Sequence, residues 1–393
     1  MGAIALGVIY QFYYGMGDTL SFHAHGSRHI WEAFMDSPQT GLQIFFSPER
    51  YDHNSYSYLS KIWFSEDAKS FFVVRIAFLF DLVTFSSYSG TAVLFAVISF
   101  IGGWLLFNTF YPYALAKIKW IAFASLYLPS VLFWGSGLLK DTITLAALGI
   151  ATYCFHQLLV LRKVKIIEII LLLISLFCLY SIRKFILQAY LPSIFLWTLA
   201  VHLKNINLQI IRVLLIPFIS VVAMAGSYFA IVVVGDGDKQ YSIDKLAMTA
   251  KITAYDIRYG WGARMGEGSG YTLGELDGTW QSMLKLAPGA INVTLFRPYL
   301  WEVQNPLMIA SALESLFILF LTFFFIYKSR GRLFEAIFSP PVLFCFCFAI
   351  VFAFAVGVST FNFGTLARYK IPVIPFYIIG LILLSNGEKK TNG

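Results

Sequence analysis

Asp18 is the first charged residue of the chain, and it ends the sequence Tyr14-Gly-Met-Gly-Asp18, where an apolar segment gives way to a polar loop. A carboxylate at the end of a membrane helix can act as a general base, orient an acceptor hydroxyl or bind a divalent metal. It can equally cap the short helix that follows it. We take Asp18 as the candidate catalytic residue, and the capping interpretation stays open.

Basic residues at the ends of later apolar segments are candidates for binding an anion. They form two groups, Arg183-Lys184 and Arg368-Tyr-Lys370. Cations held at segment ends beside a water-filled cavity suit a phosphate group. The alternative is that these side chains extend toward lipid headgroups. The pair Lys140-Asp141 is a further candidate, although Asp141 can also cap the next helix while Lys140 pairs with it.

The sequence Leu295-Phe-Arg-Pro-Tyr-Leu-Trp-Glu302 combines charge with aromatic rings. An Arg297–Glu302 pair with Trp301 between them could bind a sugar, because an indole face stacks on the C–H surface of a pyranose ring. Aromatic residues at a water–bilayer boundary are also ordinary membrane anchors, and this second interpretation stays open.

No metal site is predicted from the residue types. Three histidines lie close together, His23, His25 and His29, but no cysteine or carboxylate spacing completes a ligand set. The four cysteines stand inside apolar runs, where they behave as small core residues. No cofactor is required by these patterns, although a divalent metal at Asp18 stays possible.

The elements that must position these residues are membrane helices. Of the 393 residues, 58% are hydrophobic and only 13% are charged, whereas a soluble domain has about 25% charged residues. We therefore expect an all-α, polytopic integral membrane protein, with residues 1–393 as a single membrane domain of about ten transmembrane helices. The expected segments are 3–14, 90–111, 120–137, 142–161, 166–182, 185–202, 208–234, 307–327, 340–360 and 371–385.

Two long polar loops separate these segments, 15–68 and 235–305. Within the first, residues 28–36 have the apolar spacing of a short amphipathic helix at a membrane surface. Residues 71–85 are apolar but contain Arg75 and Asp81, so we expect a re-entrant or interfacial helix there.

The net charge of +8 does not indicate nucleic-acid binding, because the basic residues cluster in short loops between apolar segments. In a membrane protein such clusters mark the cytoplasmic side, so they indicate how the chain is oriented in the membrane. These basic loops fall on the cytoplasmic side if residues 71–85 do not span the membrane. Both termini are then cytoplasmic, and both long loops are extracytoplasmic. Arg183-Lys184 and Arg368-Tyr-Lys370 fall on the outer side, where topology alone gives no reason for basic residues.

Three stretches together resemble the GT-C superfamily of membrane glycosyltransferases, found in bacterial surface-polysaccharide and glycolipid pathways. They are Tyr14-Gly-Met-Gly-Asp18, the stretch Leu128-Pro-Ser-Val-Leu-Phe-Trp-Gly-Ser-Gly-Leu-Leu-Lys-Asp141, and Asn362-Phe-Gly-Thr-Leu-Ala-Arg-Tyr-Lys-Ile-Pro-Val-Ile-Pro-Phe376. The resemblance covers most of the chain in outline. The family often has two adjacent acidic residues where this chain has Asp18 alone.

The resemblance implies transfer of a sugar from a polyprenyl-phosphate donor to an extracytoplasmic acceptor, in the bacterial inner membrane. Asp18 matches the position of the family's catalytic carboxylate. In some members, arginines near the outer ends of spans hold the donor phosphate, and Arg183 and Arg368 are the candidates for this role here. The implied partners are the lipid-linked sugar and membrane lipids.

Other functions remain open on the sequence. An O-antigen-type polysaccharide polymerase or ligase would depend on the outer arginines and not on Asp18. A transporter or flippase of lipid-linked substrates would show inverted repeats and charges near the middle of the membrane. A non-catalytic assembly factor of the cell envelope is a further possibility.

Overall fold

The protein is described here by a computed structural model, which covers residues 2–47, 53–204, 243–261 and 269–386. In these ranges every regular element is a helix, and the only β-type pairing is an isolated bridge between Gly270 and Asn362. The prediction of an all-α fold is confirmed. The chain divides into two compact units, which are described one at a time.

Unit 1 comprises Met1–Leu105, Val131–Ala151 and Leu171–Arg183. It contains wholly or in large part α1 (Gly2–Phe12), α2 (Asp18–Phe22), α3 (Arg28–Asp36), α4 (Pro38–Phe46), α5 (Tyr56–Leu59), α6 (Ala68–Thr84), α7 (Tyr88–Phe110), α9 (Pro129–Trp134), α10 (Lys140–Phe155) and α11 (Ile166–Ile182). A π-helical turn, His23–Ser27, joins α2 to α3.

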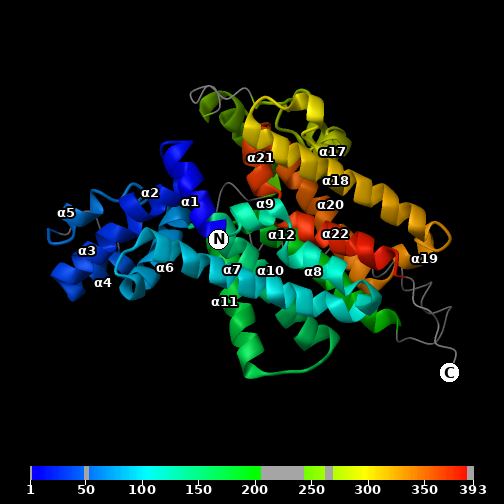
Figure 1. Cartoon of the computed structure of the whole chain (residues 1–393), viewed down its shortest axis with the longest axis horizontal. Coiled ribbons are helices and arrows are strands. Elements are labelled where there is room, and N and C mark those ends of the chain that lie inside the picture. Colours follow the sequence, from blue (N-terminus) through cyan, green and yellow to red (C-terminus); the bar gives the residue numbers. More distant parts are fainter. Residues whose placement is uncertain (1, 48–52, 205–242, 262–268, 387–393) are drawn as a thin grey trace. The chain divides into compact units, whose positions relative to one another are not determined.

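The core of unit 1 forms around α6. Phe71, Val74 and Phe78 of α6 are buried, and they belong to one hydrophobic cluster with Ile30 and Ala33 of α3. The helix predicted over residues 28–36 is therefore confirmed in its bounds, and part of its apolar face is covered by protein. Helices α3 and α4 lie side by side (Figure 1).

Unit 2 comprises Leu106–Ser130, Thr152–Ile170 and Lys184–Gly393, of which the described ranges form helices. They are the 3₁₀ turn Tyr111–Lys117, α8 (Ile118–Leu126), the π-helical turn His156–Val160, α12 (Lys184–Lys204), α14 (Ile243–Tyr255) with the π-helical turn Asp256–Trp261, α16 (Trp280–Lys285), α17 (Ala287–Phe296), the 3₁₀ turn Leu300–Glu302, α18 (Pro306–Ser329), α19 (Leu333–Ile337), α20 (Pro340–Thr360), α21 (Phe363–Tyr369) and α22 (Val373–Leu384).

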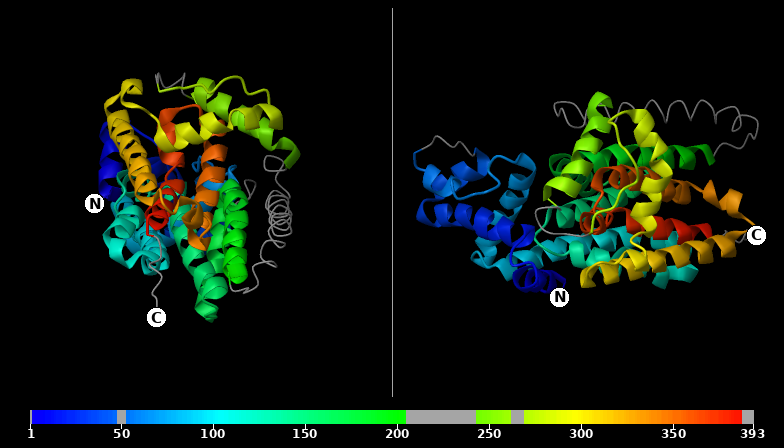
Figure 2. Two further views of the ribbon diagram at one scale, coloured as in Figure 1. Left: turned by 90° about the vertical axis from the view of Figure 1, so that its right-hand side faces the viewer. Right: turned by 90° about the horizontal axis from the view of Figure 1, so that it is seen from above.

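The core of unit 2 is built on α20 and α22. Helix α20 packs against α12, α17 and α22, and these helices run close together in Figure 2. Every residue of α22 is buried. A helix that is apolar all round is stable only when protein or lipid covers all its faces, and here neighbouring helices cover it. Helices α21 and α22 meet at a bend of 63°.

Among the residues that the structure describes, five helices are long and apolar enough to cross a membrane, or six if the bent pair α21–α22 forms one span. They cover Tyr88–Leu126, Lys140–Val160, Lys184–His202, Pro306–Ser329 and Pro340–Thr360. These helices fit a multi-pass membrane protein, as predicted. The expected number of about ten spans is not confirmed.

Several of the expected segments do not form a helix long enough to span a membrane, for different reasons. Residues 166–182 form α11, which has 17 residues. In place of the segment expected at 3–14 stands α1, which has 11 residues and ends at Phe12. Residues 120–137 divide into α8 and α9. The segment 208–234 lies outside the described residues. Of the expected helix 71–85, all residues but Phe85 lie within α6, which ends at Thr84 and is not among the spanning candidates; its membrane position stays a prediction.

The expected loop 235–305 is partly helical, since α14, α16 and α17 fall within it. The first expected loop, 15–68, likewise contains α2 to α5. Their placement outside the membrane, and the grouping of residues 1–393 as one membrane domain, stay predictions.

Candidate functional site

Two glycines shape the backbone that carries Asp18. Gly15 has φ of 74°, a left-handed conformation that glycine adopts without strain. At Gly17 a Cβ atom would lie 2.2 Å from a ring carbon of Tyr10, so only glycine allows this close approach. Asp18 then begins α2, with an exposed side chain.

The residue after Asp18 ties α2 to two distant parts of unit 1. The buried Thr19 hydroxyl accepts a hydrogen bond from the backbone amide of Leu138 (3.2 Å) and shares one with the hydroxyl of Tyr88 (2.9 Å). Leu138 stands two residues before Lys140. This contact brings the start of α2 to the start of α10, where the Asp18 carboxylate attracts the Lys140 ammonium group.

Lys140 also pairs with a carboxylate that the sequence analysis did not select. Its Nζ atom donates to Oδ2 of Asp67 at 3.1 Å. Asp67 caps α6, accepting from the amide of Lys69 (3.0 Å) and from the Ser70 hydroxyl. Burial acts to raise the pKa of Asp67, but the Ser70 hydrogen bond and the Lys140 charge outweigh burial and hold the pKa below its ordinary value.

Asp141 pairs with Arg183 and not with its neighbour Lys140. The Arg183 guanidinium lies 2.6 Å from Oδ1 of Asp141, and both side chains are almost fully buried. Asp141 stands in the first turn of α10, where a negative charge interacts favourably with the helix dipole. Arg183 was predicted to bind a donor phosphate, and the structure shows its charge balanced by a carboxylate of the protein.

Unit 1 therefore holds a cluster of five charged side chains from four regions of the chain: Asp18, Asp67, Lys140, Asp141 and Arg183. Carboxylates outnumber cations in it. Asp18 and Asp67 are the more exposed members, and Lys140 lies near both of them. Such a group can accept a proton at Asp18 and stabilise a developing negative charge at Lys140.

Unit 2 holds the other predicted site residues, beginning with Arg297 and Glu302. They form an ion pair in which the Nε atom of Arg297 lies 3.1 and 3.0 Å from the two carboxylate oxygens. The same guanidinium stands over the rings of Tyr271 (5.6 Å) and Phe363 (5.3 Å). Arg297 is thus held on several sides by its own unit.

Lys370 is fully buried and completes this arrangement. Its Nζ atom donates to the backbone carbonyl of Arg297 (3.2 Å) and to the hydroxyl of Ser315 (2.9 Å). That carbonyl directly follows α17, so the lysine charge lies where the helix dipole favours a cation. These contacts are sufficient reason for a buried lysine, and the anion-binding role stays a prediction.

The remaining predicted residues also belong to unit 2. Trp301 is 81% exposed and stacks on Tyr299, with ring centroids 4.8 Å apart. Lys184 begins α12, and Arg368 lies in the last turn of α21; both are half-buried. The expectation that Arg183 and Arg368 hold one phosphate stays a prediction.

A second buried polar pair in unit 1 was not selected from the sequence as a site. Nε2 of His23 lies 3.7 Å from Oδ1 of Asp81 and 3.4 Å from the hydroxyl of Ser86. The Thr91 hydroxyl donates to Asp81 at 2.5 Å. Burial lowers the pKa of His23 and raises that of Asp81. The one indication of this pair in the sequence was Asp81, a charged residue inside an apolar segment.

The three clustered histidines have separate partners. His23 faces Asp81, His25 stacks on Trp63 with ring centroids 3.7 Å apart, and His29 pairs with Glu32 at 2.9 Å. Among the residues that the structure describes, no three His, Cys, Asp or Glu side chains form a group that could hold a metal ion.

Comparison with protein-family models, with curated proteins and with solved structures gives no match to this chain. The chemistry of the charged cluster in unit 1 is therefore the basis on which a function is proposed.

Proposed function

We propose that the protein is an integral membrane glycosyltransferase, which transfers a sugar from a polyprenyl-phosphate donor to an acceptor on the extracytoplasmic side of a bacterial inner membrane. One observation carries the proposal. The hydrogen bond from the Leu138 amide to the Thr19 hydroxyl brings the start of α2, which carries the exposed carboxylate of Asp18, to the start of α10, which carries Lys140.

The two groups fit the two charges that the reaction develops. The acceptor hydroxyl gives its proton to the Asp18 carboxylate as its oxygen bonds to the anomeric carbon. The bond between that carbon and the donor phosphate breaks, and polyprenyl phosphate leaves with the electron pair. Lys140 stabilises the negative charge on the leaving phosphate.

The buried pair Asp141–Arg183 has a positioning role in this proposal. It holds the start of α10, from which Lys140 projects, and Asp67 holds the lysine from its other side. The long apolar helices suit a substrate whose polyprenyl chain lies in the membrane. Arg368 and Lys184, which belong to unit 2, stay predictions from the sequence for binding a phosphate.

The test uses the full chain, purified and placed in lipid nanodiscs. The assay measures release of polyprenyl phosphate from a panel of polyprenyl-phosphate hexoses and pentoses. We expect Asp18→Asn to lower kcat by about 100-fold or more, because it removes a general base while keeping the size of the side chain. Lys140→Gln should lower it by about 10- to 1,000-fold, as loss of an electrostatic contact to the leaving group does.

Glu275→Gln is the matched control, since Glu275 is an exposed carboxylate of unit 2. Turnover by Asp18→Asn within twofold of the wild type would contradict the proposal. Polymer synthesis retained by that variant would favour the polymerase or ligase interpretation. Movement of the lipid-linked sugar across a vesicle membrane, with no glycosidic bond formed, would favour a transporter.

A further inference from the structure

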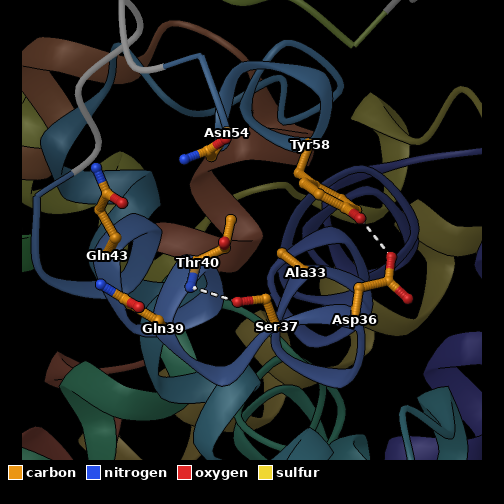
Figure 3. Close-up of a pocket in the computed structure, with 8 residues that line it drawn as sticks. All are labelled: Ala33, Asp36, Ser37, Gln39, Thr40, Gln43, Asn54 and Tyr58. Carbon is orange, nitrogen blue, oxygen red and sulfur yellow. Dashed lines mark hydrogen bonds between the residues drawn. The ribbon is translucent and has the colours of Figure 1, made fainter.

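Unit 1 has an open polar cavity of about 390 Å³ that none of the predicted site residues lines. It lies between the end of α3, one face of α4 and the region of α5 (Figure 3). Its volume falls in the range of about 300–1,000 Å³ that is usual for small-molecule sites.

The wall that α4 contributes is set by the sequence of that helix. Gln39 and Gln43 are four residues apart, which places both amides on one helix face, with Thr40 beside them. Gly41 allows α4 to approach α3 closely, because a Cβ atom there would lie 2.5 Å from Cα of Phe34. Ile44 of α4 is buried in the hydrophobic core and holds the helix in place.

The junction between α3 and α4 shapes the lower edge of the cavity in Figure 3. Ser37 caps α4 by accepting a hydrogen bond from the amide of Thr40 at 3.4 Å, and Pro38 follows as the first helical residue. Across the cavity, the Tyr58 hydroxyl donates to Oδ2 of Asp36. The positions of Asp36 and Tyr58 are thereby coupled.

The lining side chains have a distinctive chemistry. Three are primary amides, Gln39, Gln43 and Asn54, and each amide both donates and accepts hydrogen bonds. Asp36 is an acceptor, and the Tyr58 ring offers an apolar face. Among the described residues that line the cavity, none is a lysine, an arginine or a histidine.

We propose that this cavity binds a neutral saccharide of one or two sugar units. Sugar hydroxyls are donors and acceptors at once, so they match amides and a carboxylate, and a sugar's C–H face can lie on an aromatic ring. A phosphate ligand would face the Asp36 carboxylate, and no lysine, arginine or histidine is among the described residues that line the cavity. The role of the bound sugar as the acceptor rests on the proposed function, while the binding itself does not.

The experiment measures binding of saccharides to the full chain in nanodiscs by saturation-transfer NMR and calorimetry. The probes are glucose, galactose, mannose, N-acetylglucosamine, rhamnose, lactose and maltose, with inorganic phosphate as the anionic probe. At least one sugar should bind with a Kd of millimolar or lower. Gln39→Ala and Gln43→Ala should each raise that Kd by about tenfold, since each loses hydrogen bonds to the ligand.

Gln281→Ala is the matched control, because Gln281 is an exposed glutamine on α16, in unit 2, and should leave the Kd unchanged. Tyr58→Leu and Tyr58→Phe separate the contributions of the ring and the hydroxyl. The Leu variant should lose binding more than the Phe variant does. Alanine at 39 and 43 is well tolerated in a helix, so these variants should stay folded.

The saccharide site is overturned if no sugar of the panel binds, if the Gln39 and Gln43 variants bind as the wild type does, or if inorganic phosphate binds more tightly than every sugar. The Asp18→Asn variant separates this proposal from the proposed function. Undiminished transfer by that variant with saccharide binding intact overturns the catalytic role of Asp18 alone. If Asp18→Asn loses transfer and the chain binds none of the sugars, the saccharide site alone is overturned.

Discussion

At the residue scale, two ion pairs of unit 1 join charged residues that are far apart in the chain and not those that are adjacent. Lys140 and Asp141 are adjacent in the chain, yet each pairs with a distant residue, Lys140 with Asp67 and Asp141 with Arg183. Adjacent residues at the start of a helix point in directions about 100° apart, so they rarely face each other. The cation that was predicted to bind phosphate is consequently neutralised inside the protein.

Breaking the Asp141–Arg183 pair should destabilise unit 1 strongly. Arg183→Met leaves the buried Asp141 charge without its partner, and we expect a loss of about 3–5 kcal/mol in the free energy of unfolding. The double variant Asp141→Leu with Arg183→Met should recover most of this loss, because no buried charge remains. Chemical unfolding in detergent measures both.

Lys163→Met is the control for this series, since Lys163 is exposed. If Arg183→Met unfolds within about 1 kcal/mol of the wild type, the pair is not structural. Arg183 would then be available for the phosphate role predicted from the sequence.

The Arg297–Glu302 pair predicts a dependence of stability on pH. Burial acts to raise the pKa of Glu302, but Arg297 and the Tyr299 amide outweigh burial and hold that pKa below its ordinary value of 4.5. A group whose pKa is lowered on folding stabilises the protein when it is ionised. Its contribution is present above about pH 4.5 and is lost as the pH falls through the lowered pKa.

Thermal unfolding between pH 3 and pH 7 measures this contribution. Glu302→Gln should lower the stability at pH 7 by about 1–3 kcal/mol and should flatten the acid limb of the profile. Glu275→Gln, at an exposed loop position, should leave the profile as it is. An unchanged acid limb in Glu302→Gln would show that this pair does not set the pH dependence.

At the element scale, glycine governs how closely the helices of unit 1 approach one another. A Cβ atom at Gly149 of α10 would lie 2.2 Å from the backbone oxygen of Gly102 in α7. A Cβ atom at Gly102 would in turn lie 2.6 Å from Cα of Ala146. Small residues at the interface between two membrane helices let their backbones come into direct contact.

Gly149→Ala should therefore destabilise the protein by about 1–3 kcal/mol, because the two backbones must separate. In an ordinary helix the same change stabilises by up to about 1 kcal/mol, so the sign of the effect is diagnostic. Gly331→Ala is the control, since a Cβ atom there meets nothing within 4 Å. A stabilising Gly149→Ala would show that α7 and α10 are not in close contact.

The bounds of some helices were predicted from the sequence more accurately than those of others. The segment expected at 340–360 matches α20 in its bounds, because Pro340 starts the helix and the apolar run is unbroken. The segment expected at 90–111 is joined by helical turns to the first part of the segment expected at 120–137. Together they form Tyr88–Leu126, which has 39 residues and contains a non-helical residue at Ala114. A straight helix of that length would measure about 58 Å, almost twice the thickness of a bilayer core.

At the scale of the whole molecule, sidedness is the prediction on which the proposed reaction depends. The positive-inside pattern places residues 235–305 outside and the basic run that includes Lys163 inside. The proposed reaction requires Asp18 to lie on the outer side of the membrane, where it would meet a polyprenyl-phosphate sugar.

Cysteine accessibility in intact cells tests this topology. In a chain whose four cysteines are replaced by alanine, Glu275→Cys should react with a membrane-impermeant maleimide from outside. Lys163→Cys should react only after the cells are permeabilised. Both positions are exposed in the structure, so the protein itself does not shield them. The reverse labelling pattern would invert the topology and remove the extracytoplasmic site.

The sequence by itself determined the helical class and the membrane-spanning character of the protein, because both depend on the local run of apolar residues. It also identified Asp18, Lys140, Asp141 and Arg183 as charges that needed an explanation. Only the tertiary structure decided their partners, since an ion pair requires two side chains within a few ångströms and chain spacing does not report that distance. The same holds for Asp67 and for the polar cavity beside α4, whose members are ordinary surface residues until the fold brings them together.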